Sequence, residues 1–400
     1  MSHRTSLLAL LVATGTLQAQ EASVVDALTK GKASLDLRTR YEHVDDSVSA
    51  KSADAVTNRL VLTYTSARWN DISLTAQFEN VAVLGETRHF VPQTGYGSST
   101  HATIVDQPLS GLNQLFVEWK GLKVGRQVVN LDNQRFIGSV GWRQNDQTFT
   151  GLTYALDTRY VGLTLGHLTQ AQLITGLTKP INGELANVDV KVIPQGHIRA
   201  FYYAFDEQVK AGTALATATG TSTANSVKHA GARIDGDAWK LFYDVSAVKQ
   251  DRYKDATTAG TLEADYRYLG LGFRFTKDHS LQVAKETLEP GFKTPYATLH
   301  AWNGWVDRFL ATPAKGLEDT FATYKGKVGA WTFEASHHTY KAETDGTAYG
   351  KEWNALVGYQ VNKTWSLLAK AGTYTGDTAS APGALSKDTK KVWFQSLLKF

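Results

Sequence analysis

The chain contains no cysteine, few prolines and little net charge. Of its 400 residues none is Cys and only 8 are Pro, and the formal net charge is +4. The absence of cysteine excludes a disulfide scaffold and any thiolate metal site. The small net charge does not indicate a nucleic-acid partner. After the first twenty residues no run approaches the roughly 18 apolar residues that a membrane-spanning helix needs, which excludes a bundle of such helices.

Aromatic residues and glycine, in contrast, are plentiful. Aromatics make up 11% of the chain, with 10 Trp and 17 Tyr, and there are 34 Gly. A chain of this length could form two or three soluble domains or one large barrel. A search for long apolar runs does not detect membrane barrels, because only alternate residues of each strand face lipid. The composition suits many strands, short turns and interfacial aromatic girdles.

Residues 1–19 have the pattern of a secretory signal peptide. Arg4 supplies the charged start, Leu7–Val12 the apolar core, and Leu17-Gln18-Ala19 a cleavage site. The apolar core is too short for a membrane anchor. We therefore expect cleavage to leave residues 20–400 as one mature domain beyond the inner membrane.

The last ten residues, 391–400, alternate between two faces. Val392, Phe394, Leu398 and Phe400 share one parity, and Gln395 lies on the other. Side chains alternate across a strand, so one face is apolar and the other is wet. A strand that ends on a C-terminal Phe resembles the closing strand of bacterial outer-membrane barrels, and the rest of the chain must then supply a closed sheet.

The remaining chain repeats alternating segments joined by short turns and long loops, which predicts about eighteen strands, an even number as in bacterial single-chain barrels. These strands are Ala33–His43, Asn58–Trp69, Ile72–Glu79, Leu112–Lys120, Leu122–Val129, Phe149–Leu156, Tyr160–Leu168, Gly183–Ile193, His197–Phe205, Lys228–Asp235, Trp239–Val248, Leu262–Phe275, Ser280–Leu288, Asp319–Lys327, Ala330–Tyr340, Glu352–Val361, Trp365–Tyr374 and Lys391–Phe400.

The short turns, near Asn70, Gly121, Asp157, Gln195, Gly236, Lys277, Gly329 and Asn362, all fall on the side of the C-terminus. We interpret that side as periplasmic. The long loops near residues 44–56, 84–110, 206–226 and 341–349 are then extracellular. Five tryptophans lie within a residue or two of a short turn on the outward parity: Trp69, Trp119, Trp239, Trp331 and Trp365. This is the position of an interfacial girdle; a soluble β protein with core tryptophans is the alternative, and it does not explain the clustering.

Two stretches, residues 130–146 and 294–310, break the pattern of alternation. They mix arginines, carboxylates and amides with aromatic residues and have neither a strand nor a helix period. Such a segment is too polar for lipid, but it can fold into a wet lumen and present side chains to a solute.

Both stretches also carry a family resemblance. Gly125-Arg126-Gln127, Asn130-Leu-Asp-Asn-Gln-Arg-Phe-Ile-Gly and Val140-Gly-Trp-Arg-Gln-Asn resemble one signature of the alginate export family of outer-membrane porins. Thr294-Pro, Leu299-His-Ala-Trp-Asn-Gly-Trp and Asp307-Arg-Phe-Leu resemble its second signature. The resemblance runs from about residue 35 to the terminus. It implies one large monomeric barrel with inward-folded loops and a charged lumen. The chain is shorter than an alginate exporter would typically be, so the resemblance indicates the family more firmly than the substrate.

Arginines and their neighbours in these stretches, together with arginines of lumen parity, are the candidates for a solute path. They are Arg126, Asn130, Asp132, Arg135, Arg143, Asp307 and Arg308 at the constriction, and Arg38, Arg40, Arg59, Arg199 and Arg274 on strands. Guanidinium groups bind carboxylates in bidentate fashion, so a ladder of them could pass an acidic sugar or an aromatic acid. The alternative is that the arginines pair with Asp132 and Asp307 and merely pin the loops.

We therefore predict an all-β, single transmembrane antiparallel barrel of about eighteen strands with inward-folded loops. It would act as an outer-membrane channel for a hydrophilic, anionic solute of the uronate or small organic acid type. The alternatives are a structural or adhesive barrel with a plugged lumen and an outer-membrane barrel enzyme. His43 and Ser47 lie in one short loop that does not support a catalytic triad, and no spacing indicates a cofactor or metal. The expected partners are outer-membrane lipid and the solute.

Overall fold

The computed structural model describes residues 23–191, 195–209, 213–219, 226–254 and 262–400. The predicted signal peptide, 1–19, lies outside these residues, as do the last two residues of the predicted strand 183–193. No helix in the described part of the chain is long and apolar enough to cross a membrane.

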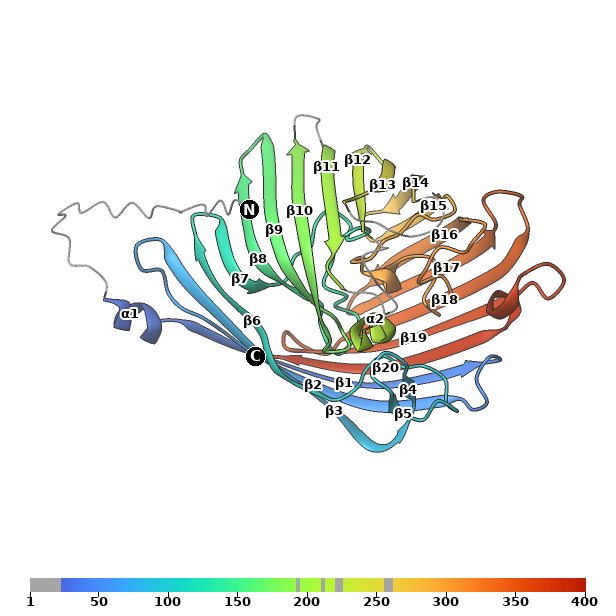
Figure 1. Cartoon of the computed structure of the whole chain (residues 1–400), viewed down its shortest axis with the longest axis horizontal. Helices are drawn as coiled ribbons and strands as arrows, with labels where there is room; N and C mark the ends of the chain where they lie inside the picture. Colours follow the sequence, from blue (N-terminus) through green and yellow to red (C-terminus); the bar gives the residue numbers. More distant parts are fainter. Residues whose placement is uncertain (1–22, 192–194, 210–212, 220–225, 255–261) are drawn as a thin grey trace, which may run out of the picture.

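Eighteen strands of the described residues form one antiparallel sheet in which each strand pairs with its neighbours along the chain (Figure 1). The first strand, β1, also pairs with the last, β20, so the sheet is a closed barrel. The barrel strands are β1 (Lys32–Asp46), β2 (Ala53–Thr65), β3 (Ile72–Arg88), β6 (Leu109–Trp119), β7 (Leu122–Gln127), β8 (Thr148–Asp157), β9 (Val161–Gln172), β10 (Thr178–Val190), β11 (Gly196–Glu207), β12 (Val227–Ala238), β13 (Leu241–Arg252), β14 (Ala264–Thr276), β15 (His279–Leu288), β16 (Leu317–Val328), β17 (Trp331–Lys341), β18 (Ala348–Gln360), β19 (Trp365–Gly376) and β20 (Thr389–Lys399).

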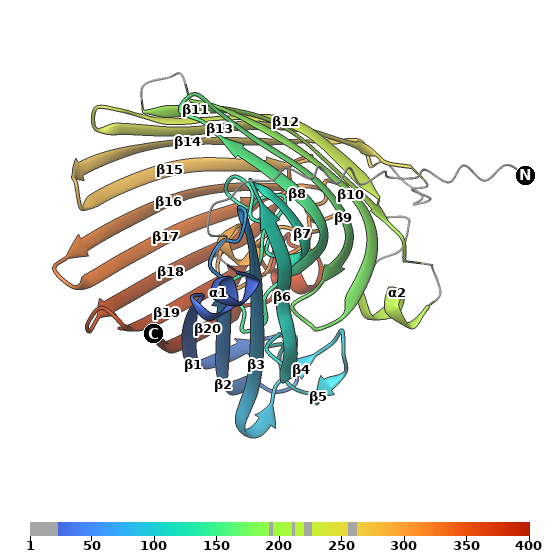
Figure 2. The same cartoon turned by 90° about the vertical axis from the view of Figure 1, so that its left-hand side faces the viewer.

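The remaining elements are short. A two-stranded ribbon interrupts the connection between β3 and β6, and the helices are single turns or little more. They are α1 (Val24–Thr29), β4 (Phe90–Val91), β5 (Tyr96–Gly97), α2 (Ala214–Thr219), η2 (Leu299–Ala301) and η3 (Gly383–Ser386). In Figure 2 the barrel is turned by 90° and α1 stands beside the turn between β2 and β3.

The seam between β1 and β20 confirms the prediction that the last segment closes the barrel. Leu37 pairs with Leu398 across this seam, and the register continues to Asp46 opposite Thr389. Beyond β20, the backbone of Phe400 exchanges two hydrogen bonds with Leu35, of 2.9 and 3.0 Å. The terminal aromatic residue is therefore part of the closed sheet.

The predicted strands are present, but their ends differ from the prediction. β2 ends at Thr65 rather than Trp69 and β7 at Gln127 rather than Val129, because the chain turns there, and several other strands are longer than predicted. β3 runs to Arg88, nine residues past the predicted end at Glu79. The alternation is lost at Asn80, which puts an amide on the outward face, where it donates a hydrogen bond to the hydroxyl of Ser110 on β6. Because this polar pair stands on the outer wall, the alternation of the sequence did not predict the second half of the strand.

The turn predicted near Gly236 is misplaced. The strands β12 and β13 stay paired up to Ala238 opposite Leu241. The chain reverses at Trp239, which has φ 58°, and at the residue after it. Trp239 is therefore the tip of the turn rather than the start of a strand, and its side chain is 83% exposed.

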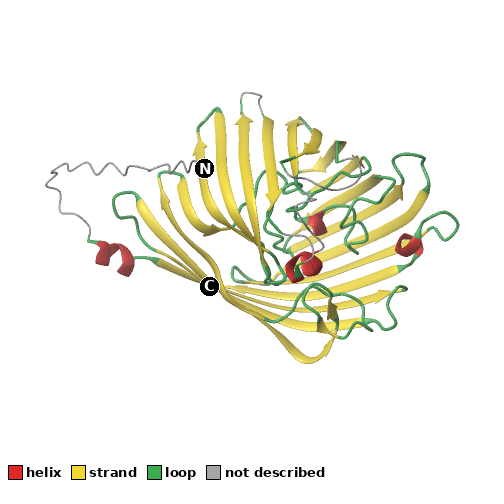
Figure 3. Cartoon of the chain, viewed as in Figure 1, coloured by secondary structure: helices red, strands yellow, loops and turns green. Residues whose placement is uncertain are grey.

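The short turns share the end of the barrel that holds the C-terminus, which we call the turn end; the opposite end is the loop end. Of the tryptophans predicted to form a girdle, Trp119 and Trp331 have about half of their surface exposed at the turn end, and Trp69 and Trp365 are less exposed. Along β1 the side chains alternate between the outer face and the lumen. Arg38, Arg40 and Glu42 point inward and are buried. Figure 3 shows loop segments inside the barrel, between the strands, as well as beyond its end.

Candidate functional site where two loops meet inside the barrel

Two long loops from the loop end fold into the lumen and bind each other there. Inner loop A is residues 128–147, between β7 and β8, and inner loop B is residues 289–316, between β15 and β16. Gly138 N donates to Tyr296 O at 2.9 Å, and Thr298 N donates to Gln134 O at 3.0 Å. The side chain of Gln147 donates to the carbonyls of both Gly138 and Tyr296. These loops coincide with the two stretches in which the sequence breaks its alternation, and their inward course confirms that prediction.

Aromatic packing holds inner loop A against the wall. Phe136 is 5% exposed, and its ring lies 5.4 Å from the rings of Phe201, His229 and Tyr266, measured between centroids. Burying a phenylalanine side chain contributes about 1.5–3 kcal/mol relative to leaving it in water. Because the ring is enclosed by three strands of the far wall, the loop is held across the lumen.

An ion pair beside Phe136 fixes the same loop to β15, and a hydrogen bond joins it to inner loop B. Nε of Arg135 donates to Glu286 of β15 at 2.7 Å, and Nη2 donates to Asn303 of inner loop B at 3.2 Å. The guanidinium also lies 5.2 Å from the ring of Trp302. Arg135 and Glu286 are almost completely buried, and a buried pair of this kind is kept only when its remaining hydrogen bonds are satisfied.

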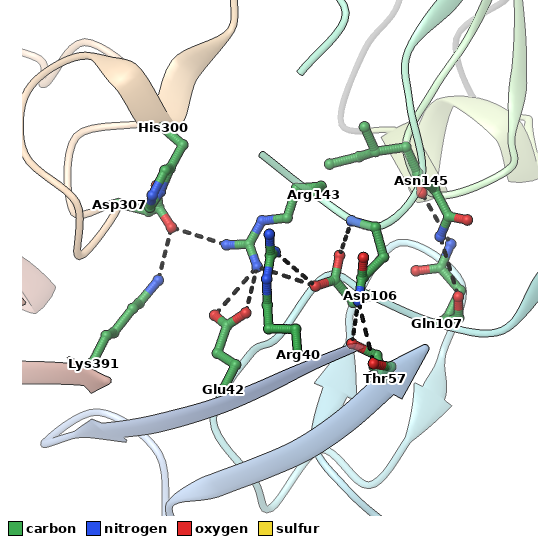
Figure 4. A network of polar contacts seen from close by, with 12 residues as sticks. Arg40, Glu42, Thr57, Asp106, Gln107, Arg143, Asn145, His300, Asp307 and Lys391 are labelled. Atoms are coloured by element: carbon green, nitrogen blue, oxygen red, sulfur yellow. Dashed lines mark hydrogen bonds and ion pairs between the residues drawn. The ribbon is translucent and has the colours of Figure 1, made fainter. Parts of the chain in front are cut away.

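The charged side chains gather around Asp307, at the point where both loops meet the seam of the barrel (Figure 4). Nη2 of Arg143 donates to Asp307 Oδ2 at 2.9 Å, and Nζ of Lys391 on β20 donates to the same oxygen at 2.8 Å. His300 lies 2.8 Å from the other carboxylate oxygen. We call this group, with the residues of the next two paragraphs, the junction cluster.

Strand β1 and a third loop complete the cluster. Glu42 accepts two hydrogen bonds from Nη1 of Arg143, at 3.2 and 3.1 Å. Arg40 donates to Gln395 of β20 at 2.7 Å and lies 3.7 Å from Asp106, which belongs to the loop between β3 and β6. Arg143 therefore connects carboxylates that come from a strand and from a loop distant in sequence.

Two further cations of the cluster have no carboxylate partner within the described residues. Arg38 donates to the side chain of Gln144 at 2.7 Å and to the carbonyl of Gly141 at 2.9 Å. Lys370 of β19 donates to His300 Nε2 at 2.8 Å. Its ammonium group lies within a cage of indole rings, at 3.8 Å from Trp305, 4.0 Å from Trp142 and 5.5 Å from Trp393. Indole faces attract cations, and no carboxylate of the described residues lies within salt-bridge distance of this amine.

The contacts of His300 indicate a neutral ring. Burial, and then the ammonium group of Lys370, hold the pKa of His300 well below its ordinary value. Nδ1–H then donates to Asp307, and the lone pair of Nε2 accepts from Lys370. Burial by itself would raise the pKa of Asp307, but Lys391 and the other neighbouring cations outweigh it and hold that pKa well below its ordinary range. The carboxylate therefore stays charged.

Two pairs of arginines lie directly opposite each other on neighbouring strands, where like charges destabilise a sheet. Arg38 faces Arg59, and Arg199 faces Arg233. Carboxylates offset both pairs. Arg59 binds Glu79 and Asp146, Arg233 binds Asp244 at 2.8 Å, and Arg199 contacts Asp132, Asp189 and Asp235. Asp132 also accepts from Asn187 and Tyr203, at 2.8 and 2.9 Å, which ties inner loop A to β10 and β11.

The other predicted site residues form no hydrogen bond or ion pair with the cluster within the described residues. Asn130 accepts a hydrogen bond from Ser139 N and stabilises inner loop A from within. Arg308 binds Thr389 and the carbonyl of Lys387 above the cluster. Arg274 pairs with Asp237 near the turn end, beyond the reach of either inner loop. Arg126 lies in the wall.

Side chains that the prediction of site residues missed are central to the cluster. Asp106 belongs to a loop that has no period to place it, and Lys391 has no sequence feature that sets it apart. His300 lies within the second signature, Leu299-His-Ala-Trp-Asn-Gly-Trp, but was not selected from it. Trp393, which is fully buried, did carry a signal. It has the inward parity of β20, where a polar side chain is expected.

A small cavity gives access to the cluster from the loop end. Its volume is about 130 Å³, and Arg143, Arg308 and Lys391 line it together with Asp46 and Thr389. No group of three or more metal-ligating side chains occurs in the described part of the chain. The arrangement offers fixed cations to an anion that arrives from the loop end.

The closed barrel of eighteen strands with inward loops is the architecture of the outer-membrane porins. The sequence matches the model of the alginate export family over residues 31–297, about two thirds of its length, and the chain belongs to that family. No curated protein matches the sequence significantly.

Among solved structures, Pseudomonas aeruginosa OpdK with vanillate is similar, with a TM-score of 0.68 and 12% identity over 93% of this chain and 99% of that one. Acinetobacter baumannii OccAB1 has a TM-score of 0.67 and 14% identity over 96% and 100%. Pseudomonas aeruginosa OccK11 has a TM-score of 0.65 and 15% identity over 93% and 96%. At these identities the likeness concerns the fold.

Proposed function

We propose that the protein is a channel of the Gram-negative outer membrane that passes small hydrophilic anions. The turn end would face the periplasm and the loop end the cell exterior. The barrel would act as a monomer, with membrane lipid around it. Inner loops A and B would form the constriction, and passage would need neither a cofactor nor an energy source, because a pore needs only weak and repeated binding along its path.

The excess of positive charge at the junction cluster carries this proposal. The cluster, with Arg38 included, holds five cations and three carboxylates. The cations are Arg38, Arg40, Arg143, Lys370 and Lys391, and the carboxylates are Glu42, Asp106 and Asp307. A ring of fixed charge at a narrow point favours ions of the opposite sign. The carboxylate of a solute could then bind Lys370 or Arg38, which have none.

The side chains around the two cations without a carboxylate partner, Lys370 and Arg38, indicate the class of solute. Indole rings stand around Lys370, and aromatic rings stack on aromatic solutes and on the apolar faces of sugars. A small aromatic or sugar acid therefore fits better than an inorganic anion. Vanillate, the compound with which OpdK was crystallised, is such an aromatic acid, and uronates are the sugar acids that the family name suggests.

Single-channel recording tests the proposal. The refolded protein would be inserted in a planar bilayer, and the reversal potential would be measured under a KCl gradient. We expect an anion-selective current that vanillate or a uronate oligomer blocks at lower concentration than the matching uncharged alcohol or sugar. An open pore with cation selectivity would refute the anion path.

The burial of the cluster favours a second candidate function. Arg40 is 1% exposed, and Lys370 and Lys391 are each 6% exposed, so side chains fill the lumen around them. A barrel plugged at this level would serve as a structural or adhesive protein through its outer loops. A bilayer that stays silent at all voltages, with folded protein present, would favour this function over a channel.

A further inference from the structure

The barrel wall has a gap beside β7. β6 pairs with β3 along its whole length, but with β7 only over Leu115–Trp119 (Figure 1). β7 ends at Gln127 because the chain turns inward there as inner loop A, and the next wall strand, β8, starts at Thr148. β8 starts level with the end of β7, because Gln127 lies opposite Phe149. With no continuation of β7, residues 109–114 of β6 have no strand partner on this side.

Arg126 spans this gap. Its Nη1 donates to the carbonyl of Leu112 on β6 at 2.8 Å, and its Nε donates to the hydroxyl of Thr148 on β8 at 3.2 Å. Nη2 donates to Gln172 on β9. Backbone groups at membrane depth must be satisfied within the protein, and here one side chain satisfies an edge carbonyl that the absent strand leaves free.

The charge of Arg126 lies between the lumen and the lipid. Its cross-strand partner is Leu115, an outward residue that is 43% exposed. On the inner side it shares a cavity of about 100 Å³ with Glu79 and Asp146. Arg59 already binds both of these carboxylates, at 2.7 and 2.6 Å. Within the described residues no carboxylate lies within salt-bridge distance of Arg126.

An unpaired cation at this depth is costly and usually marks a ligand or a path. We propose that the wall gap is a lateral binding site for the acidic head group of a single-chain amphiphile from the membrane, such as a fatty acid. The carboxylate binds the guanidinium of Arg126. The alkyl chain lies outside, along Leu112, Leu115 and Leu152, each 43% exposed. The cavity has about the volume of three water molecules in the liquid, which suits the three heavy atoms of a carboxylate.

The lack of cysteine in the chain allows a direct test. A single cysteine is introduced by Leu152→Cys, beside the gap, or by Leu271→Cys on β14, and is labelled with a fluorophore. Leu152 lies five residues before the last residue of β8, as Leu271 does in β14, so the depths match. Both proteins are placed in lipid nanodiscs. The quencher is stearic acid with a nitroxide near its carboxyl group, and its methyl ester is the uncharged control.

We expect the acid to quench the Leu152→Cys label more than the Leu271→Cys label, because a charge-assisted hydrogen bond enriches it locally by about tenfold. The methyl ester should quench both labels equally. Arg126→Gln in the Leu152→Cys protein should remove the excess, with folding checked by heat-modifiable electrophoresis. The ester control needs no change at Arg126, so the test holds even if that variant does not fold.

Two outcomes would overturn the inference. The first is equal quenching of the two labels by the acid. The second is loss of the excess when water-soluble benzoate is added, because the site would then be filled from the lumen rather than from the membrane. Neither outcome bears on the selectivity of the pore, which the bilayer recording measures separately.

Discussion

The carboxylate of Asp307 accepts hydrogen bonds from Arg143 at 2.9 Å and from Lys391 at 2.8 Å on the same oxygen. Arg143 belongs to inner loop A and Asp307 to inner loop B, so this contact joins the two loops at the place where they meet β20.

We expect Asp307→Asn to lower the free energy of unfolding by about 3–5 kcal/mol, because the buried cations Arg143 and Lys391 lose their partner. Thermal unfolding should shift downward, and single-channel current should become larger and noisier. Asp345→Asn is the control. Asp345 pairs with Lys315 at the surface, where a salt bridge contributes about 0–1 kcal/mol, so that variant should change neither measurement.

Replacing Lys370 tests the source of selectivity. Lys370→Gln keeps a polar side chain in the indole cage but removes an amine that has no carboxylate within salt-bridge distance in the described residues. We expect the anion-to-cation permeability ratio to fall by about twofold or more. Lys325→Gln serves as the control, because Lys325 lies near the turn end and its side chain is 63% exposed. An unchanged reversal potential in Lys370→Gln would remove this residue from the anion path.

The pair of Arg135 and Glu286 lends itself to a double-mutant cycle. Arg135→Gln leaves a buried carboxylate without its cation and should lower the free energy of unfolding by about 3–5 kcal/mol. Adding Glu286→Gln removes the uncompensated charge, so the double variant should be more stable than the single one. Chemical unfolding in detergent micelles gives both values. A double variant less stable than Arg135→Gln would show that the two side chains are not coupled as a pair.

Stability should fall as the solution becomes acidic, and His300 should account for part of the fall. The pKa of His300 is held well below the ordinary value of 6.5 by burial and by Lys370. At a pH below 6.5 this histidine binds a proton in the unfolded chain but stays neutral in the folded chain. The free energy of unfolding therefore decreases by about 1.4 kcal/mol for each pH unit below the unfolded pKa until the folded pKa is reached. We expect the midpoint of thermal unfolding to drop between neutral pH and mildly acidic pH, and to drop less in His300→Asn. An equal drop in both proteins would place the proton uptake elsewhere.

Gly125 lies two residues before the end of β7, where the chain leaves the wall. Its φ is 132°, and a Cβ atom there would lie 2.3 Å from the carbonyl oxygen of Leu115. We expect Gly125→Ala to cost roughly 1–3 kcal/mol and to lower the fraction of protein that refolds to the heat-modifiable form. Gly111→Ala on β6 is a matched control, because nothing lies within 4 Å of the added Cβ. Similar yields for the two variants would contradict the close approach.

Much of this architecture could be predicted from local pattern. Alternation along the strands predicted the inward direction of Arg38, Arg40 and Arg59, because parity alone decides which face a side chain takes. The loss of any period predicted that residues 130–146 and 294–310 leave the wall, and both inner loops follow those stretches.

The partners inside the lumen could not be predicted in the same way. Asp106 joins Arg40 and Arg143 through a loop whose course depends on what it packs against, and no local pattern encodes that course. Arg126 was expected at the constriction but has outward parity and spans the gap in the wall. Its position follows from the early end of β7, a consequence of the inward turn and not of the strand's own residues.

The seam between β1 and β20 gives the junction cluster a place in the order of assembly. Arg40 and Glu42 come from one edge of the seam, and Lys391 and Gln395 come from the other. The two edges are the first and last strands to be synthesised, so the cluster can form only after the sheet has closed. The hydrogen bonds that hold the inner loops at this point therefore stabilise the closed barrel over an open sheet. An intermediate with an open seam would lack these hydrogen bonds. Its inner loops would therefore take their final positions in the lumen only in the last step of folding.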